Sequence, residues 1–213
     1  MIKTISQLSE DQYLLLNSIN KEYETAMSLT KDLNFKTVTF YGGANLGSET
    51  SEYKDIYKLA KSFSKIGWGV ITGGGPGVMT AGLIGAKHGG GKAIGFRINN
   101  IPGEPPVAIG DIDFGFDHFA ARKYALRQSD VYIYCPGSIG TLDELMENLD
   151  LMKTNKMPTK PIFLYDSSYW GGLVQWISEI TINKWHLGED KLLDLFKVVD
   201  TTEQIMEHLF GKN

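Results

Sequence analysis

The chain has 213 residues, the size of a single globular domain, and 42% of them are apolar, which is enough for one sizeable core. Its formal net charge of −4, without any Lys- or Arg-rich run, argues against a nucleic-acid partner. No apolar run approaches the roughly 18 residues of a membrane span, and the first twenty residues lack the apolar core of a secretory signal. We therefore expect one cytoplasmic domain over residues 1–213, with neither a membrane nor a nucleic acid as partner.

Residues 1–34 precede the first strand-like run and are predicted to form a helical extension. Leu15, Leu16, Ile19, Tyr23 and Met27 would lie along one face of it. Five short β-rich runs follow, separated by stretches of helical spacing. They are residues 36–41, 68–72, 92–96, 130–135 and 160–165. This alternation predicts an α/β fold, in which a mostly parallel, doubly wound, Rossmann-like sheet forms the middle of a three-layer sandwich. Residues 97–116 are predicted to form a long Pro- and Gly-rich loop, either a lid or a crossover.

Glycine gathers directly after three of these runs, in "GGANLG" (42–47), "GGGPG" (73–77) and "PGSIG" (136–140). A single such loop could be a tight turn. The carboxyl ends of parallel strands share one edge of the sheet, however, and open α/β sheets bind their ligands there. Three loops together indicate a cradle for a flat, phosphorylated molecule, with Gly43, Gly74 and Gly75 as candidate contacts.

The spacing in these loops argues against the common cofactor motifs. "GGANLG" departs from the dinucleotide pattern G-x-G-x-x-G, and no acidic residue follows the second strand at Thr72 to hold a ribose. None of the loops ends in Gly-Lys-Ser/Thr, so a P-loop is absent from the sequence. No cluster of His, Cys, Asp and Glu has the spacing of metal ligands. We expect neither a metal nor an organic cofactor.

The stretch "CPGSIGTLDE" (135–144) has two readings. A Gly-rich loop that opens a helix presents free backbone N–H groups to an anion, aided by the positive end of the helix dipole. The same letters also contain Thr141-x-x-Glu144, a capping box in which both side chains only satisfy the N–H groups of the helix start. The residues alone leave both readings open.

Four segments in order along the chain resemble one family. They are "GVITGGGPGVMTAG" (69–82), "FAARKYALRQSDVYIYCPGSIGTLDELMENLDLM" (119–152), "KPIFLYDSSYWGGLVQWI" (160–177) and "LFKVVDTTEQIMEHL" (195–209). They look like the Lonely Guy (LOG) family of cytokinin riboside 5′-monophosphate phosphoribohydrolases and related nucleotide nucleosidases, often mislabelled as lysine decarboxylases. The family signature P-G-G-x-G-T-x-x-E stands here as Pro136, Gly137, Ser138, Ile139, Gly140, Thr141, Leu142, Asp143 and Glu144. The family's Arg-Lys pair stands as Arg122 and Lys123.

The resemblance implies hydrolysis of the N-glycosidic bond of a nucleoside 5′-monophosphate, by a homodimer or higher homo-oligomer without a cofactor. It makes Arg122 and Glu144 the catalytic residues. Glu144 would stabilise an oxocarbenium-like ribose or position the attacking water. Arg122 would hold a ribose hydroxyl or orient Glu144, and lower the pKa of that carboxyl. The backbone from Gly137 to Thr141 would bind the 5′-phosphate, and Lys123 is a further candidate contact.

Three departures from the family pattern bear on the substrate. Ser138 replaces a signature glycine, which would cost on the order of 1 kcal/mol if the position needs a positive φ. Ala120 and Ala121 stand where plant-type members carry His-Glu, so this chain resembles the broader bacterial-type branch and the base need not be a cytokinin. "GGA" at 42–44 replaces the common Gly-Ser-Ser and removes hydroxyls near the expected base and ribose.

A non-catalytic nucleotide sensor or carrier of the same fold is the alternative function. The presence of both Arg122 and Glu144 favours the enzyme, whereas Ser138 favours the carrier. Lysine decarboxylation is rejected, because no lysine is placed to form a Schiff base with pyridoxal phosphate at this sheet edge.

Overall fold

The computed structural model describes residues 8–102 and 107–211. In this part of the chain seven strands form one sheet, and every pair of neighbours is parallel. The strands are β1 (Thr37–Tyr41), β2 (Gly69–Thr72), β3 (Ala93–Ile98), β4 (Ile112–Phe116), β5 (Val131–Tyr134), β6 (Ile162–Tyr165) and β7 (Lys197–Val199). All five predicted strands are present, and the predicted parallel sheet is confirmed.

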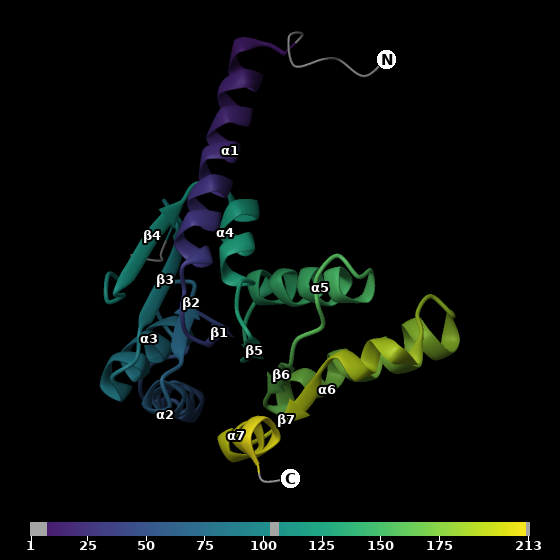
Figure 1. Cartoon of the computed structure of the whole chain (residues 1–213). Coiled ribbons are helices and arrows are strands. Elements are labelled where there is room, and N and C mark those ends of the chain that lie inside the picture. The colour runs from purple at the N-terminus through teal and green to yellow at the C-terminus, as the bar shows by residue number, and fades with distance from the viewer. Residues whose placement is uncertain (1–7, 103–106, 212–213) are drawn as a thin grey trace.

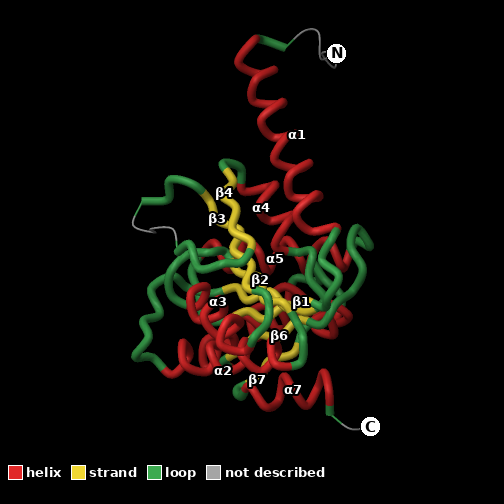
Figure 2. Tube along the Cα trace, turned by 60° about the vertical axis from the view of Figure 1, so that its left-hand side comes forward, coloured by secondary structure: helices red, strands yellow, loops and turns green. Residues whose placement is uncertain are grey.

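Helices cover both faces of the sheet (Figures 1 and 2). The α-helices are α1 (Glu10–Lys31), α2 (Ser51–Lys65), α3 (Val78–Gly89), α4 (Phe119–Leu126), α5 (Ile139–Lys153), α6 (Ser167–Gln175) and α7 (Thr202–Phe210). A π-helical segment, Trp176–Lys184, continues α6, and a 3-10 segment, Asp190–Leu195, precedes β7. Buried side chains of α2, α3 and α7 form one core layer, and those of α1, α4, α5 and α6 form the other. The three-layer α/β sandwich is therefore confirmed.

The strand order β4-β3-β2-β1-β5-β6-β7 shows that the chain builds one half of the sheet outward from β1 and then returns to build the other. β1 pairs with β2 on one side and with β5 on the other, so that Tyr41 lies beside Tyr134. The switch in direction lies between β1 and β5. In doubly wound sheets the ligand crevice opens at this point, beyond the carboxyl ends of the strands.

The interpretation of residues 97–116 as a loop is wrong at both ends. β3 runs to Ile98, and β4 occupies Ile112–Phe116 at the edge of the sheet. β4 is half-buried and contains Asp113 and Gly115, which strands normally avoid, so its pattern is weak. Arg97 compensates for the acid, because its Nε lies 2.6 Å from Oδ1 of Asp113. Residues 103–106 lie outside the described part.

The N-terminal extension is helical where the structure describes it; residues 1–7 of the predicted range lie outside. Ser9 and Gln12 form a capping box at the start of α1, and Glu22 accepts hydrogen bonds from the N–H groups of Asp117 and His118. The predicted apolar face is only partly packed, since Leu15 and Met27 are exposed. Leu15 is exposed because the first half of α1, which contains it, projects beyond the body of the protein (Figure 1). None of the described helices is long and apolar enough to cross a membrane.

Candidate active site

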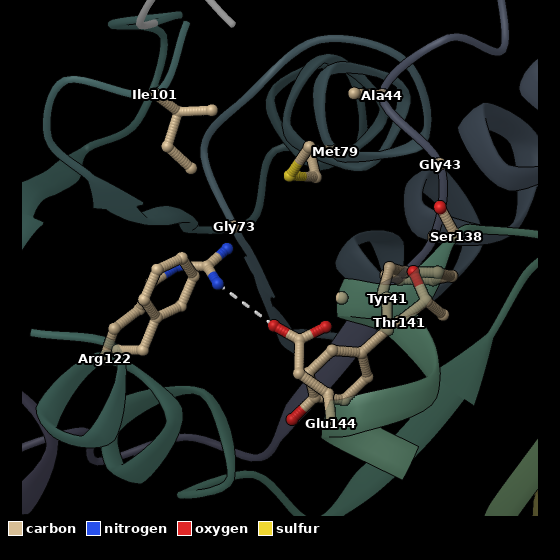
Figure 3. A pocket seen from close by; sticks show the side chains of 14 residues that line it. Tyr41, Gly43, Ala44, Gly73, Met79, Ile101, Arg122, Ser138, Thr141 and Glu144 are labelled. Carbon is tan, nitrogen blue, oxygen red and sulfur yellow. Dashed lines mark hydrogen bonds and ion pairs between the residues drawn. The ribbon is translucent and has the colours of Figure 1, made fainter.

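An open pocket lies at the switch point, with roughly 630 Å³ of empty space including its mouth. Loops after β1 and β2 form one side, and helices α4 and α5 form the other (Figure 3). The lining residues are Phe40, Tyr41, Gly42, Gly43, Ala44, Gly73, Met79, Ile101, Phe119, Arg122, Ser138, Gly140, Thr141 and Glu144.

Arg122 and Glu144 face each other across this pocket (Figure 3). Nη1 of Arg122 lies 3.0 Å from Oε1 of Glu144, and each side chain is only 12% exposed. Nε of the same guanidinium donates to the carbonyl oxygen of Phe96, within β3, at 2.7 Å. The sheet thus holds the arginine in place, and the arginine in turn orients the carboxylate.

Gly73 makes room for this arginine. A Cβ atom at Gly73 would clash with Nη2 of Arg122 and with the sulfur of Met79. The first glycine of "GGGPG" therefore admits a side chain instead of cradling a phosphate. Gly74 and Gly75, which were predicted to contact the ligand, are buried and do not line the pocket.

The pKa of Glu144 is raised, because burial penalises the charged carboxylate by more than the nearby guanidinium of Arg122 favours it. The expectation that Arg122 would lower this pKa overall is therefore wrong in its net direction. The arginine does favour the carboxylate, but the sequence could not show how deeply the group lies. Glu144 is a carboxyl group poised to exchange a proton more readily near neutral pH than a surface glutamate.

Helix α5 begins three residues earlier than the capping-box reading requires. Ser138 is the residue before the helix, and Ile139 is the first residue within it. Thr141 thus lies inside the first turn, and Glu144 lies in the second, where its carboxylate pairs with Arg122. The capping-box interpretation is wrong for this reason. The first N–H groups of a helix have no acceptor within it, and here Ser138, Gly140 and Thr141 line the pocket.

Ser138 adopts φ −97° and ψ −160°, an extended conformation open to any residue. Serine would strain the loop only at a positive φ, so it causes no strain here. Two contacts fix the loop in front of it. The N–H of Gly43 donates to the carbonyl oxygen of Pro136 at 2.8 Å. The hydroxyl of Tyr169 donates to the carbonyl oxygen of Gly137. Pro136 and Gly137 shape the site without lining it.

The remaining predicted contacts lie outside the lining. Ile139 is 74% exposed. Nζ of Lys123 pairs with Asp143 at 3.0 Å and with Glu147 at 2.8 Å, and none of these three residues lines the pocket. Sequence reasoning also missed the apolar wall formed by Tyr41, Met79, Ile101 and Phe119. Its members come from four separate elements, so no local pattern could reveal it.

A buried hydrogen-bond network holds the backbone of Glu144 in place. Nδ2 of Asn148 donates to the hydroxyl of Tyr134 at 2.7 Å, and this hydroxyl donates to the backbone carbonyl of Glu144 at 3.2 Å. The ring of Tyr41 stacks on that of Tyr134 with 4.5 Å between centroids. Burial raises the pKa of both tyrosines, so they stay neutral. The network ties the second turn of α5 to β1 and β5.

A family model described as "possible lysine decarboxylase" matches residues 79–209, which is more than half of the chain and includes Arg122, the signature loop and Glu144. The chain belongs to this family, the LOG family. The described residues contain no group of three or more His, Cys, Asp and Glu side chains that could hold a metal ion.

Two curated relatives of this LOG chain carry related names. The chain is 27% identical over 135 residues to a probable cytokinin riboside 5′-monophosphate phosphoribohydrolase, LOG6, of Arabidopsis thaliana. That match covers 60% of this chain and 65% of the relative. It is also 27% identical over 154 residues to LOGL3 of Oryza sativa subsp. japonica, a protein with the same description, over 70% of this chain and 72% of that one.

Solved structures share the fold of this LOG chain. The molybdenum cofactor binding protein of Rippkaea orientalis superposes with a TM-score of 0.60 at 22% identity, over 84% of this chain and 97% of that one. The molybdenum cofactor carrier protein of Chlamydomonas reinhardtii gives 0.59 at 19% identity, over 84% and 100%. At such identities the likeness establishes the architecture and not the ligand.

Proposed function

We propose that this LOG protein hydrolyses the N-glycosidic bond of a nucleoside 5′-monophosphate, such as AMP or a cytokinin riboside monophosphate, to the free base and ribose 5-phosphate. The observation that carries the proposal is the buried Arg122–Glu144 pair, which lies in one pocket with the open N-terminus of α5. A carboxylate and an anion site within one pocket match a substrate that joins a phosphate to a cleavable sugar bond.

The pocket offers a separate surface to each part of the substrate. The N–H groups of Ser138, Ile139 and Gly140, at the positive end of α5, would bind the 5′-phosphate. The N–H of Thr141 already donates to the carbonyl oxygen of Ser138 at 3.0 Å. The base would lie against the apolar wall that includes Met79, Ile101 and Phe119. The ribose would then span the space between these two surfaces, above Glu144.

Bond cleavage would follow the logic of glycoside hydrolysis. As the base departs with the bonding electrons, the ribose gains oxocarbenium character, which the Glu144 carboxylate stabilises. The same carboxylate positions a water molecule and takes one of its protons as the water adds to the sugar carbon. That proton then passes to the departed base, so that the neutral base is released and Glu144 is ionised again. Arg122 stays charged, holds Glu144 in place, and has donors free to hold a ribose hydroxyl.

We also propose that the protein works in the cytoplasm as a homodimer. Phe119, Ile139 and Met146 are large apolar side chains of α4 and α5, and between 39% and 74% of each is exposed. A second copy packed over these helices would cover them. Light scattering should give twice the 23.7 kDa chain mass, and a monomer at micromolar concentration would contradict the dimer.

A nucleotide-binding carrier without turnover is the second candidate, and the fold that the chain shares with molybdenum cofactor binding and carrier proteins is the observation that favours it. The Arg122–Glu144 pair argues for the enzyme, because it holds a carboxylate in the pocket lining, where it would stabilise an oxocarbenium-like ribose. The family description does not favour a decarboxylase here, because none of the residues that line the pocket is a lysine.

The test is incubation of the protein with a panel of nucleoside 5′-monophosphates, AMP first, with chromatographic detection of free base. Glu144→Gln is the control. We expect base release by the wild type and a loss of about 10²-fold or more in the variant, since positioned acid–base groups contribute at least that much. Full activity in Glu144→Gln would remove Glu144 from the mechanism. AMP binding without base release would favour the carrier.

A further inference from the structure

Tyr169 lies in the first turn of α6 and contacts the signature loop from outside the pocket. Its hydroxyl donates to the carbonyl oxygen of Gly137, although Tyr169 comes 32 residues later in the chain and belongs to neither family signature. The side chain is 40% exposed, so core packing does not explain its position. The contact couples α6 to the segment that opens α5.

The start of α6 is built to hold this side chain still. Asp166 caps the helix, because its Oδ1 accepts from the N–H of Ser168 at 2.9 Å. Trp170 is fully buried, and its Nε1 donates to the carbonyl oxygen of Tyr134 at 3.1 Å. The ring of Tyr169 packs edge-on against the indole with 4.9 Å between centroids. The hydroxyl is therefore presented to Gly137 by a rigid support.

Peptide geometry gives this contact a consequence on the other side of the loop. In a planar trans peptide the carbonyl and the following N–H point in opposite directions. The carbonyl of Gly137 points to Tyr169, so the N–H of Ser138 points away from α6. In the same way, the N–H of Gly43 holds the carbonyl of Pro136 and sets the direction of the N–H of Gly137. Two successive N–H groups are thus oriented by two outside donors.

We propose that Tyr169 is a positioning residue for the substrate phosphate: by holding the Gly137 carbonyl, it directs the N–H of Ser138 at a phosphate oxygen. The inference rests on the proposed phosphate site at the start of α5. It assigns Tyr169 no contact with the substrate. Its removal should therefore weaken only the interactions that a phosphate makes, and leave the ribose, the base and the bond-breaking step as they are.

The test compares Tyr169→Phe with the wild type and with Tyr57→Phe as a matched control. Tyr57 loses an equivalent hydroxyl contact, to Nδ1 of His88 at 3.0 Å, in a pair that does not line the pocket. Calorimetry would give the dissociation constants of AMP, inorganic phosphate and adenosine. Base release would give KM and kcat for AMP, and thermal unfolding would report any general loss of stability.

We expect Tyr169→Phe to weaken AMP and inorganic phosphate about fivefold, as for the loss of one neutral hydrogen bond. KM for AMP should rise by a similar factor, with kcat and adenosine binding unchanged. Unchanged AMP affinity, or equal weakening of AMP and adenosine, would overturn the inference, as would a wild type that binds neither phosphate nor AMP. A wild type that binds AMP but releases no base would overturn the proposed hydrolysis alone, since binding still tests Tyr169.

Discussion

Helices α4 and α5 carry two sets of opposite charges that are neighbours in sequence and lie in different surroundings. The inner pair, Arg122 and Glu144, faces the pocket, and both side chains are 12% exposed. The outer set joins the same two helices outside the pocket lining, where the side chains are 17% to 53% exposed. It consists of Lys123, Arg127, Asp143 and Glu147, joined by ion pairs of 2.8 to 3.0 Å.

The inner pair and the outer set consist of the same residue types but have different roles. Each step along a helix turns the side chain by about 100°, so Arg122 and Lys123 of one sequence motif part to different sides. Exposed ion pairs typically contribute less than about 1 kcal/mol to stability. The inner pair is buried enough to raise the pKa of Glu144. Function should therefore depend on the inner pair and be largely indifferent to the outer set.

The largest difference should come from replacing the two arginines in turn. Arg122→Lys cannot bridge the Phe96 carbonyl and Glu144 with one planar fork. We expect kcat for base release to fall about 10²- to 10³-fold, the usual loss for one oriented donor. Arg127→Lys is the matched change in the outer set and should leave kcat within about twofold. Similar losses in both variants would refute the distinction between the two sets.

Gly73→Ala should displace the inner pair although it replaces neither Arg122 nor Glu144. The added methyl group would push Nη2 of Arg122 aside, and small misplacements of catalytic groups can cost about 10²-fold in rate. Steady-state kinetics of base release would measure the loss. Gly172→Ala, in α6, adds the same methyl group in open space. That control should keep full activity, and an active Gly73→Ala would show that Arg122 tolerates displacement.

The pH dependence should distinguish the two glutamates. Because burial raises the pKa of Glu144, its carboxylate is present above that pKa and is lost as the pH falls through it. We expect kcat/KM to fall about tenfold per pH unit on the acid side, with a midpoint above the ordinary value of about 4.3. Glu147→Gln should leave that midpoint in place. A midpoint at or below the ordinary value would contradict the role given to Glu144.

The smallest effect should come from restoring the signature glycine. Ser138 has an extended backbone, so Ser138→Gly relieves no strain and adds freedom to the unfolded chain, costing about 0.4–1 kcal/mol in the free energy of unfolding. Thermal unfolding would show the cost, and KM for AMP should change by less than about threefold. A large gain in AMP affinity would instead mean that serine distorts the phosphate loop.

Much of the fold could be predicted from local pattern. The five predicted strands are central strands or lie next to them, and their apolar runs mark burial on both faces. β4 and β7 were not predicted, because edge strands need less apolar surface. β4 carries Asp113, which Arg97 on the neighbouring strand neutralises. Met27 shows the same limit for helices, because its apolar character indicates burial but not which face of α1 finds a partner.

The sequence by itself determined the α/β architecture, the clustering of Gly-rich loops at one sheet edge, and the candidacy of Arg122 and Glu144. The first two follow from periodicity and from the position of the glycines, which are local properties of the chain, and the third follows from the resemblance to the LOG family signatures. Only the tertiary structure decided that Gly73 and not Gly74 lines the pocket, that Lys123 pairs with Asp143 and Glu147 outside it, and that the pKa of Glu144 is raised. These depend on side chains brought together from distant elements, since burial and contact are properties of the packed chain.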